Sequence, residues 1–217
     1  MFVKVCGTTS EEDALLAVAM GADAVGFIFA PSPRQVSAAL VRNVVHRLPP
    51  EVVTVGVFRD AAPEQVVKTV NGIGLKVAQL HGHETPEQVR WVVERVPTVI
   101  NAFPAGSGAI ARAGEYGAQI LMLDAPSPGS GQVFDWRLVD GVPPGSRLLL
   151  AGGLTPANVG EAVAQAHPWG VDVCTGVESS PGHKDPVKLR AFVAAARKAA
   201  PREYHSAGDG PFDWEAE

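Results

Sequence analysis

Two side chains in this sequence could exchange protons with a small molecule: the thiol of Cys6 and the carboxyl of Asp124. Cys6 follows a short apolar segment, and Asp124 ends another. A buried cysteine is usually a small core side chain and only sometimes a base or a nucleophile, so Cys6 alone leaves its role open. An acid at the end of an apolar strand cannot stay unpaired in the core. We therefore expect Asp124 to face a cleft, where burial would raise its pKa and make it a general acid near neutral pH.

Several other polar residues stand at the ends of apolar runs. Arg34 follows the run 24–29 and a loop that two prolines stiffen. Its guanidinium could hold a carboxylate of a ligand, or it could be a solvated loop charge. His81 could be a structural hydrogen-bonding residue at a strand end or a group that meets a ligand. The remaining candidates lie late in the chain: Gly152, Gly153, Asp172, Cys174, Thr175 and Gly176.

The segments between these residues alternate between apolar runs and helical spacing. The runs lack polar alternation, which is typical of strands buried on both faces. They predict strands at 2–5, 24–29, 52–58, 76–80, 99–102, 120–124, 148–151 and 171–174. Thr85 is a predicted N-cap, with Pro86 at the first helical position. Helices are predicted at 11–20, 37–48, 63–70, 86–96, 109–116 and 134–139, after Thr155-Pro156 up to residue 166, and at 186–198.

Eight strand-then-helix units of roughly 25 residues each predict an α/β architecture with a parallel sheet. With right-handed crossovers, eight units close a (β/α)₈ barrel, the TIM barrel, over residues 1–200. A doubly wound open sheet is the alternative, but its usual Gly-rich dinucleotide fingerprint is absent from Cys6-Gly7-Thr8-Thr9. The loop 125–131, rich in Pro, Gly and Ser, is expected to be mobile until something holds it. Residues 201–217 are expected to form a mostly disordered tail.

In a (β/α)₈ barrel, the loops that follow the strands form the active face. The candidate residues all follow strands, so we expect them to meet at one rim. Loops after strands seven and eight are the usual phosphate site of this fold, since glycines let backbone N–H groups converge on an anion. The alternative is that Gly152, Gly153 and Gly176 only form tight turns.

Composition excludes several classes of function. The net charge is −5, and the scattered Lys and Arg residues form no basic stripe for nucleic acid. The longest apolar runs are far shorter than the ~20 residues of a membrane span, and no signal-peptide pattern starts the sequence. Two cysteines provide no disulfide framework. We expect a cytoplasmic monomer or homodimer with no nucleic-acid or membrane partner.

The chain resembles a known family, the phosphoribosylanthranilate isomerases of tryptophan biosynthesis. The resemblance rests on motifs that occur in the family's order between Lys4 and Asp185. These are Lys4-Val5-Cys6-Gly7, the segments 23–29, 32–34, 55–58 and 79–82, Leu123-Asp124 with 134–136, the segment 150–154 with Pro156 and Asn158-Val159, and the segments 171–173, 176–178, 181–182 and 184–185.

The resemblance implies a cofactor-free Amadori rearrangement of N-(5-phosphoribosyl)anthranilate to 1-(2-carboxyphenylamino)-1-deoxyribulose 5-phosphate. It places the general base on Cys6 and the general acid on Asp124, two groups that must hold opposite protonation states in one cleft. Arg34 matches the arginine that holds the anthranilate carboxylate, while His81 and Asp172 match positions that line the substrate. The phosphate is assigned to the two glycine-containing loops: Gly152 and Gly153, and Cys174, Thr175 and Gly176.

One departure from the family concerns Cys174-Thr175, where two small hydroxyl residues are usual. A thiol is a weaker hydrogen-bond donor, which puts one phosphate contact in doubt. Strands one and eight are neighbours in a closed barrel, so Cys6 and Cys174 share a rim. We hypothesise that oxidants link or crowd these thiols and silence the base.

Three other functions are alternatives to this one: two other kinds of enzyme and a binding protein. Histidine-pathway aminoaldose isomerases, or a dual-substrate version, use an aspartate where Cys6 stands and take a substrate with phosphates at both ends. A non-catalytic phosphosugar-binding barrel would be expected to have lost part of the set Cys6, Arg34 and Asp124. A metal-dependent epimerase would need a cluster of His and carboxylates that the strand ends do not supply. No metal or cofactor is expected.

Overall fold

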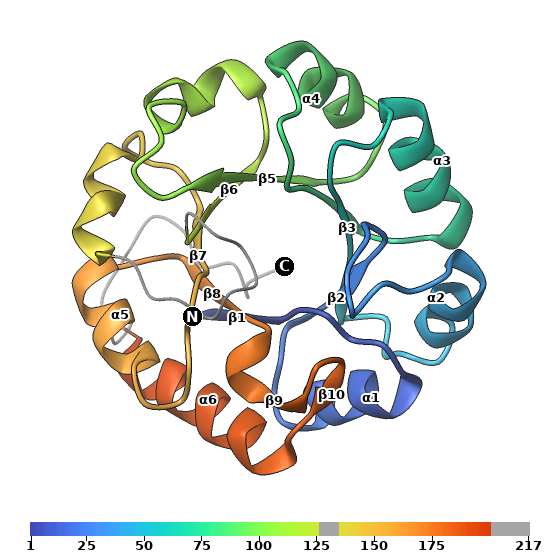
Figure 1. The fold of residues 1–217 in the computed structure, drawn as a ribbon, viewed down its shortest axis with the longest axis vertical. Coiled ribbons are helices and arrows are strands. Elements are labelled where there is room, and N and C mark those ends of the chain that lie inside the picture. The colour runs from blue at the N-terminus through green and yellow to red at the C-terminus, as the bar shows by residue number, and fades with distance from the viewer. Residues whose placement is uncertain (126–134, 201–217) are drawn as a thin grey trace, which may run out of the picture.

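Eight parallel strands close into a barrel in the computed structural model, which describes residues 1–125 and 135–200. Each strand pairs with the next, and β8 pairs with β1 to complete the ring (Figure 1). The strands are β1 (Phe2–Val5), β2 (Ala24–Ile28), β3 (Val53–Phe58), β4 (Val77–Leu80), β5 (Val99–Pro104), β6 (Ile120–Asp124), β7 (Leu148–Leu150) and β8 (Gly170–Val173). The predicted (β/α)₈ barrel is confirmed. The predicted tail 201–217 and most of the predicted mobile loop lie outside the described residues.

Helices form a ring around the strands (Figure 1). Their N-termini follow the sequence signals: Ser10 caps α1, and Thr85 and Gln88 form a capping box at α4 ahead of Pro86. The α-helices are α1 (Glu11–Ala19), α2 (Ala38–Val45), α3 (Pro63–Ile73), α4 (Pro86–Val93), α5 (Val159–Ala166) and α6 (Pro186–Ala199). None of the helices in the described parts of the chain is long and apolar enough to cross a membrane.

Two of the predicted short helices are 3₁₀ helices: η1 (Ile110–Tyr116) and η2 (Trp136–Gly141). In η1, Arg112 has φ −106° and ψ 16°, which interrupts a regular helix. The segment is short and contains Gly114, so it lacks the length and propensity that favour the α form. The predicted Pro181-Gly182 turn joins two short strands that the sequence did not predict, β9 (Glu178–Ser180) and β10 (His183–Lys184).

The core has two parts. One lies between the barrel and its helices, where the apolar faces of α1 to α6 meet outward-facing strand residues. The other fills the barrel interior with mostly β-branched and small side chains: Cys6, Ala24, Val55, Val57, Val77, Ile100, Ala102, Ile120, Met122, Leu149 and Ala151. Cys6 is therefore an interior-facing residue at the end of β1.

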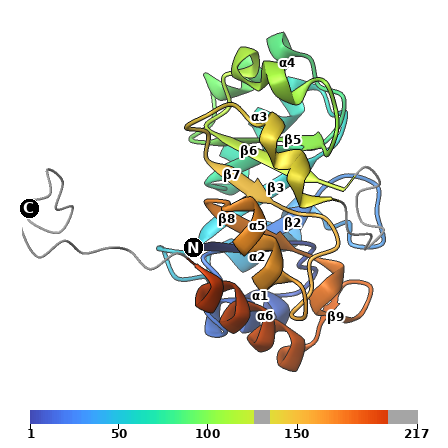
Figure 2. The same ribbon diagram turned by 90° about the vertical axis from the view of Figure 1, so that its left-hand side faces the viewer.

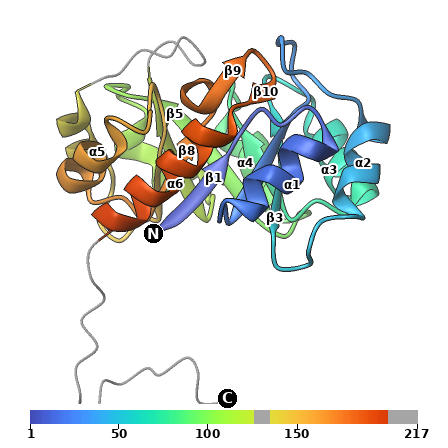
Figure 3. The same cartoon turned by 90° about the horizontal axis from the view of Figure 1, so that it is seen from below.

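The β9–β10 hairpin lies on the side of the barrel opposite the N-terminus of the chain (Figures 2 and 3). The parallel strands end on that side, so the hairpin stands at the rim where their carboxyl ends meet. A three-residue 3₁₀ helix, η3 (Thr175–Val177), connects β8 to the hairpin. The last strand thus leads into an extra structure that covers part of the active face.

Candidate active site

A pocket of about 460 Å³ opens among the carboxyl ends of the strands. Its walls include six of the residues predicted from the sequence: Cys6, Arg34, His81, Asp124, Asp172 and Cys174. A smaller hollow of about 60 Å³ is lined by Gly152, Gly153, Thr175 and Gly176 and shares Asp124, Asp172 and Cys174 with the larger one. The structure therefore brings every predicted site residue to one rim.

The Cys6 thiol is buried directly beyond the end of β1. Its backbone N–H donates to the carbonyl of Val173 on β8 at 2.8 Å, and its carbonyl accepts from Nζ of Lys184 at 2.6 Å. These two bonds fix the backbone of Cys6 from both sides. Burial raises the pKa of the Cys6 thiol, and the ammonium of Lys4 opposes that rise.

Lys4 is a fully buried lysine inside the barrel, two residues before Cys6. Its Nζ donates to Oδ1 of Asp172 at 2.8 Å, across the register pair that joins β1 to β8. Burial lowers the pKa of Lys4, but the charges of Asp172 and Cys6 and the hydrogen bonds to both together outweigh burial and hold that pKa above its usual value. The ammonium therefore stays charged. Asp172 lines the pocket, as expected from the sequence, with one oxygen committed to Lys4.

Asp124 and His81 form a carboxyl–imidazole pair on the other side of the pocket. Oδ2 of Asp124 lies 3.1 Å from Nε2 of His81, and Oδ1 accepts from the backbone N–H of Ala125 at 2.7 Å. Nε2 of Gln79 lies 2.9 Å from Nδ1 of His81, and with the amide oriented this way the imidazole carries its proton on Nε2 and donates it to Asp124. Gln79 is buried, and its Oε1 has no hydrogen-bond partner.

Arg34 is buried and forms a two-pronged ion pair, so the hypothesis of a solvated loop charge is wrong. Its Nε donates to Oε1 of Glu178 at 2.8 Å and its Nη2 to Oε2 at 2.6 Å. Lys184 adds a bond from its Nζ to Oε1 of Glu178 at 3.0 Å. Arg34 and Lys184 outweigh burial and hold the pKa of Glu178 below its usual value. The β9–β10 hairpin thus fixes Arg34 beside the pocket, with Nη1 outside the pair.

Cys174 stands next to Cys6 across the β1–β8 seam, one residue beyond the register pair Val5 and Val173. Both cysteines are free thiols. Sγ of Cys174 lies 3.9 Å from Oε1 of Glu178, and burial, with Cys6 nearby, raises the pKa of Cys174 to about 12. Neighbouring positions on paired strands lie within the Cα separation that a disulfide can span.

Peroxide should therefore inactivate the protein by oxidising Cys6 and Cys174 to a disulfide. Both would lose a proton and an electron as peroxide is reduced to water, and dithiothreitol would restore activity. A Cys174→Ser variant should lose activity more slowly and irreversibly, because its Cys6 would be oxidised without a partner. The measurement is residual activity against time, with the disulfide sought by mass spectrometry. Equal loss in both proteins, without a reducible Cys6–Cys174 bond, contradicts the hypothesis.

Gly152, in the smaller hollow, is required by close approach as well as by backbone shape. Gly152 has φ +86°, and a Cβ there would lie 2.5 Å from the backbone nitrogen of Ala125. A side chain at residue 152 would therefore disturb the chain directly after Asp124. The glycines form tight turns and also border an open hollow, so the tight turns do not argue against a phosphate site there. The first residue of η3, Thr175, also borders this hollow.

Four residues that shape the site lie in the recognised motifs but were given no role from the sequence: Lys4, Gln79, Glu178 and Lys184. For Lys4 a signal was present, because residues two apart on a strand share a face, and Cys6 was assigned to the site. The same spacing relates Gln79 to His81. Glu178 and Lys184 carried no local signal, because they act through a hairpin that was not predicted.

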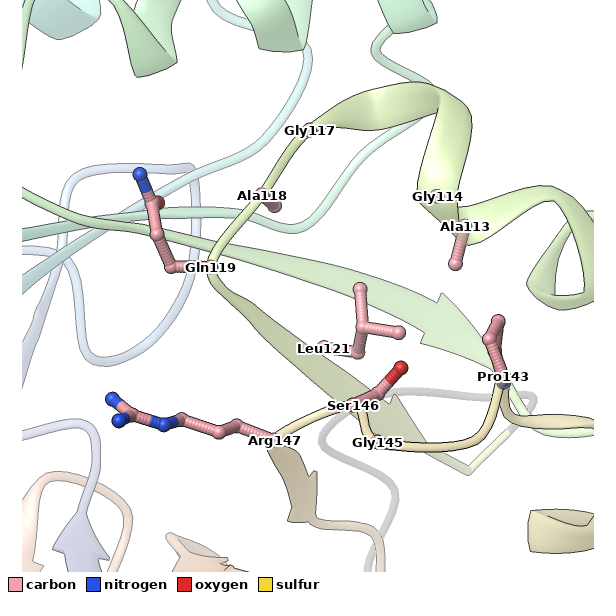
Figure 4. Close-up of a pocket in the computed structure, with 10 residues that line it drawn as sticks. All are labelled: Ala113, Gly114, Gly117, Ala118, Gln119, Leu121, Pro143, Gly145, Ser146 and Arg147. Carbon is pink, nitrogen blue, oxygen red and sulfur yellow. The ribbon is translucent and has the colours of Figure 1, made fainter.

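Another pocket, of about 320 Å³, lies between η1 and the segment before β7 (Figure 4). Its lining includes Gln119 and Leu121 at the start of β6, at the opposite ends of the strands from Cys6. Gln119 uses its Oε1 to accept from the backbone N–H of Val99. In residues 1–125 and 135–200, no group of three or more His, Cys, Asp or Glu side chains is placed to hold a metal ion.

A closed (β/α)₈ barrel with Cys6, His81 and Asp124 on a pocket at the carboxyl ends of its strands has the architecture of a TIM-barrel enzyme. Comparison with known families agrees: the family described as N-(5'-phosphoribosyl)anthranilate (PRA) isomerase matches residues 3–195. The chain belongs to this family.

Individual relatives match over almost their whole length. The N-(5'-phosphoribosyl)anthranilate isomerase of Desulforudis audaxviator is 47% identical over 204 residues, covering 91% of this chain and 98% of the relative. The crystal structure of the isomerase from Thermus thermophilus has a TM-score of 0.86 at 43% identity, covering 91% of this chain and 99% of that one. A second structure is an isomerase in complex with reduced 1-(o-carboxyphenylamino)-1-deoxyribulose 5-phosphate, with a TM-score of 0.80 at 37% identity, covering 91% of this chain and 99% of that one.

Proposed function

We propose that this chain converts N-(5'-phosphoribosyl)anthranilate into 1-(2-carboxyphenylamino)-1-deoxyribulose 5-phosphate in tryptophan biosynthesis, with Cys6 as base and Asp124 as acid. The observation that carries the proposal is that both groups line one pocket in a chain of this family. The reaction is an internal oxidation and reduction of two adjacent carbons. It needs no external electron acceptor, so one acid and one base suffice.

The reaction begins at Asp124. In its acid form, this residue protonates the ring oxygen of the ribose, and the C1–O bond breaks to give an open-chain iminium ion. Cys6 thiolate then removes the proton from C2, which leaves an enolamine. The enolamine then tautomerises to the ketone: C1 gains the proton that Cys6 holds, and the C2 hydroxyl loses its own to Asp124, which restores the thiolate of Cys6 and the acid form of Asp124. His81 orients Asp124 through the 3.1 Å contact.

The two ends of the substrate would be held on different sides of Cys6. The phosphate fits the hollow lined by Gly152, Gly153 and Gly176, with Cys174 and Thr175 at its edge. The carboxylate of the anthranilate would meet Arg34, whose Nη1 is outside the Glu178 pair. Holding both ends fixes C2 near the thiol, because proton transfer requires close positioning. Asp172 and His81 line the space between.

An Arg34→Met variant should raise KM for the substrate much more than it lowers kcat. The methionine keeps the apolar stem but removes the charge, a loss of about 2–4 kcal/mol of binding for a desolvated charge pair. Steady-state kinetics give both constants. Arg47→Met is the matched control, since Arg47 is exposed and pairs with Glu11 on the outer surface. An unchanged KM in the Arg34 variant would show that Arg34 does not bind the carboxylate of the substrate.

The assay that tests the function follows the loss of fluorescence of the anthranilate adduct in the presence of EDTA. The histidine-pathway aminoaldose is run in parallel. Turnover of the anthranilate substrate alone is the expected result. Equal turnover of both would make the chain a dual-substrate isomerase, and no turnover of either by folded protein would contradict the proposal.

We further propose that the protein acts in the cytoplasm as a monomer or a homodimer, as expected for an enzyme of amino-acid biosynthesis. Light scattering coupled to size-exclusion chromatography distinguishes the two assemblies.

A further inference from the structure

A thiol that acts as a base must be present as the thiolate, yet Cys6 sits where a thiolate is disfavoured. Only 6% of the residue is exposed. Removing an anion from water costs free energy unless a cation or hydrogen-bond donors replace the water. The site must therefore contain a group that compensates the charge of the thiolate.

Lys4 is placed to do so. Its side chain is completely buried and lies on the same face of β1 as Cys6, since the two are separated by two positions. A buried ammonium has three N–H donors and no acceptor. One of them is bonded to Asp172 at 2.8 Å, which holds Nζ in place and leaves two for other partners.

The backbone of β2 shows how closely the two groups approach. A Cβ on Gly26 would lie 3.0 Å from Sγ of Cys6 and 3.2 Å from Nζ of Lys4. Both atoms thus lie against the same point on β2, where the missing side chain leaves room for them. An alanine there would press on both atoms.

The other charged groups near Cys6 are arranged differently. Lys184 from β10 bonds to the carbonyl oxygen of Cys6 and to Glu178, and its charge lowers the pKa of the thiol less than that of Lys4 does. Arg34, from the loop after β2, is committed to Glu178 through two bonds. The carboxylate of Asp172 acts in the opposite direction, because negative charge disfavours a thiolate.

We propose that Lys4 is a positioning residue whose ammonium, held against Gly26 by Asp172, stabilises the thiolate of Cys6 inside the barrel. This inference rests on the proposed role of Cys6 as base. Asp172 then has two opposed effects: it anchors the ammonium, and its own charge makes the thiolate harder to form. In an Asp172→Asn variant the amide oxygen can still accept from Nζ of Lys4, so the anchor is kept while the opposing charge is removed. Lys4→Met and Asp172→Asn should therefore shift the ionisation of Cys6 in opposite directions.

The test measures the ionisation of Cys6 without substrate. In a Cys174→Ser parent, Cys6 is the remaining cysteine, and its rate of alkylation by iodoacetamide is followed by mass spectrometry from pH 5 to 11. Lys4→Met should move the midpoint of this curve upward by about 1–3 pH units, the usual effect of an adjacent opposite charge. Lys4→Arg keeps the positive charge and should leave the midpoint close to that of the parent. Asp172→Asn should move the midpoint downward. Lys68→Met, an exposed change on α3, should leave it in place.

Equal midpoints for the parent and a folded Lys4→Met variant would overturn the proposal. If Lys4→Met does not fold, Asp172→Asn decides, because an unchanged or raised midpoint contradicts the arrangement. Loss of packing alone would not give shifts of opposite sign. The proposed function fails separately: a Cys6→Ala variant with wild-type turnover would refute the base without altering the alkylation curves. For variants that retain turnover, the acidic limb of kcat/KM against pH should move with the midpoint.

Discussion

A Cys6→Ala variant should lose roughly 10²–10⁴ of kcat, the usual contribution of a positioned acid or base. Alanine removes the atom that takes the proton from C2 and leaves the pocket otherwise intact, so KM should change little. The measurement is the rate of fluorescence loss at saturating substrate. Circular dichroism and thermal unfolding establish that the variant is folded.

Cys6→Ser is the companion variant. A hydroxyl is a far weaker acid than a thiol, so the serine should not form an anion beside Lys4 and should be nearly as inactive as alanine. Turnover by either variant within a few-fold of wild type would show that another group removes the proton.

The second large effect is expected for Asp124→Asn. The amide keeps the size of the side chain and can still accept from the N–H of Ala125, but it cannot deliver a proton to the ring oxygen. We expect a loss of roughly 10²–10⁴ in kcat with the fold preserved. Steady-state rates with the anthranilate substrate measure it.

Glu64→Gln serves as the control for Asp124→Asn, because Glu64 is an exposed acid on α3 and has no role in the site. This variant should match wild type. If Asp124→Asn also matched wild type, ring opening would have to be driven by another acid, and His81 would be the first candidate because of its position in the pocket.

Much of the fold could be predicted because its signals are local. The eight apolar runs are strands that hydrogen-bond to neighbours on both sides, and caps such as Ser10 and Thr85 mark helix starts. Two of the predicted helices are 3₁₀ helices, and such short stretches do not contain enough residues for the sequence to distinguish the 3₁₀ form from the α form. The predicted mobility of the 125–131 loop and the predicted disorder of residues 201–217 stay predictions.

The position of the site could be predicted from the sequence, but the ion pairs between its residues could not. Knowing that the chain is a barrel places Cys6, His81 and Asp124 at one rim, because each ends a strand. The pairing of Arg34 with Glu178 joins residues 144 positions apart and depends on the β9–β10 hairpin. Such a contact is set by tertiary packing, and neither of the two segments carries a sequence signal that predicts its partner.

The role of Lys4 could be predicted only in part. Its place in a strand buried on both faces already required a charged partner, since an unpaired ammonium in the core is costly. The partner, Asp172, follows only from the closure of β8 onto β1. Sequence reasoning assigned Asp172 to the substrate, and the structure adds its bond to Lys4.

The central claim is that Cys6 and Asp124 together carry the proton transfers, and the most direct test is the double variant Cys6→Ser/Asp124→Asn. Its rate of fluorescence loss is compared with wild type and with buffer alone, in EDTA and at saturating substrate. The folded double variant should be no more active than the less active of the two single variants and should approach the rate in buffer, because residues that act as a unit do not contribute additively. Turnover within tenfold of wild type would contradict it.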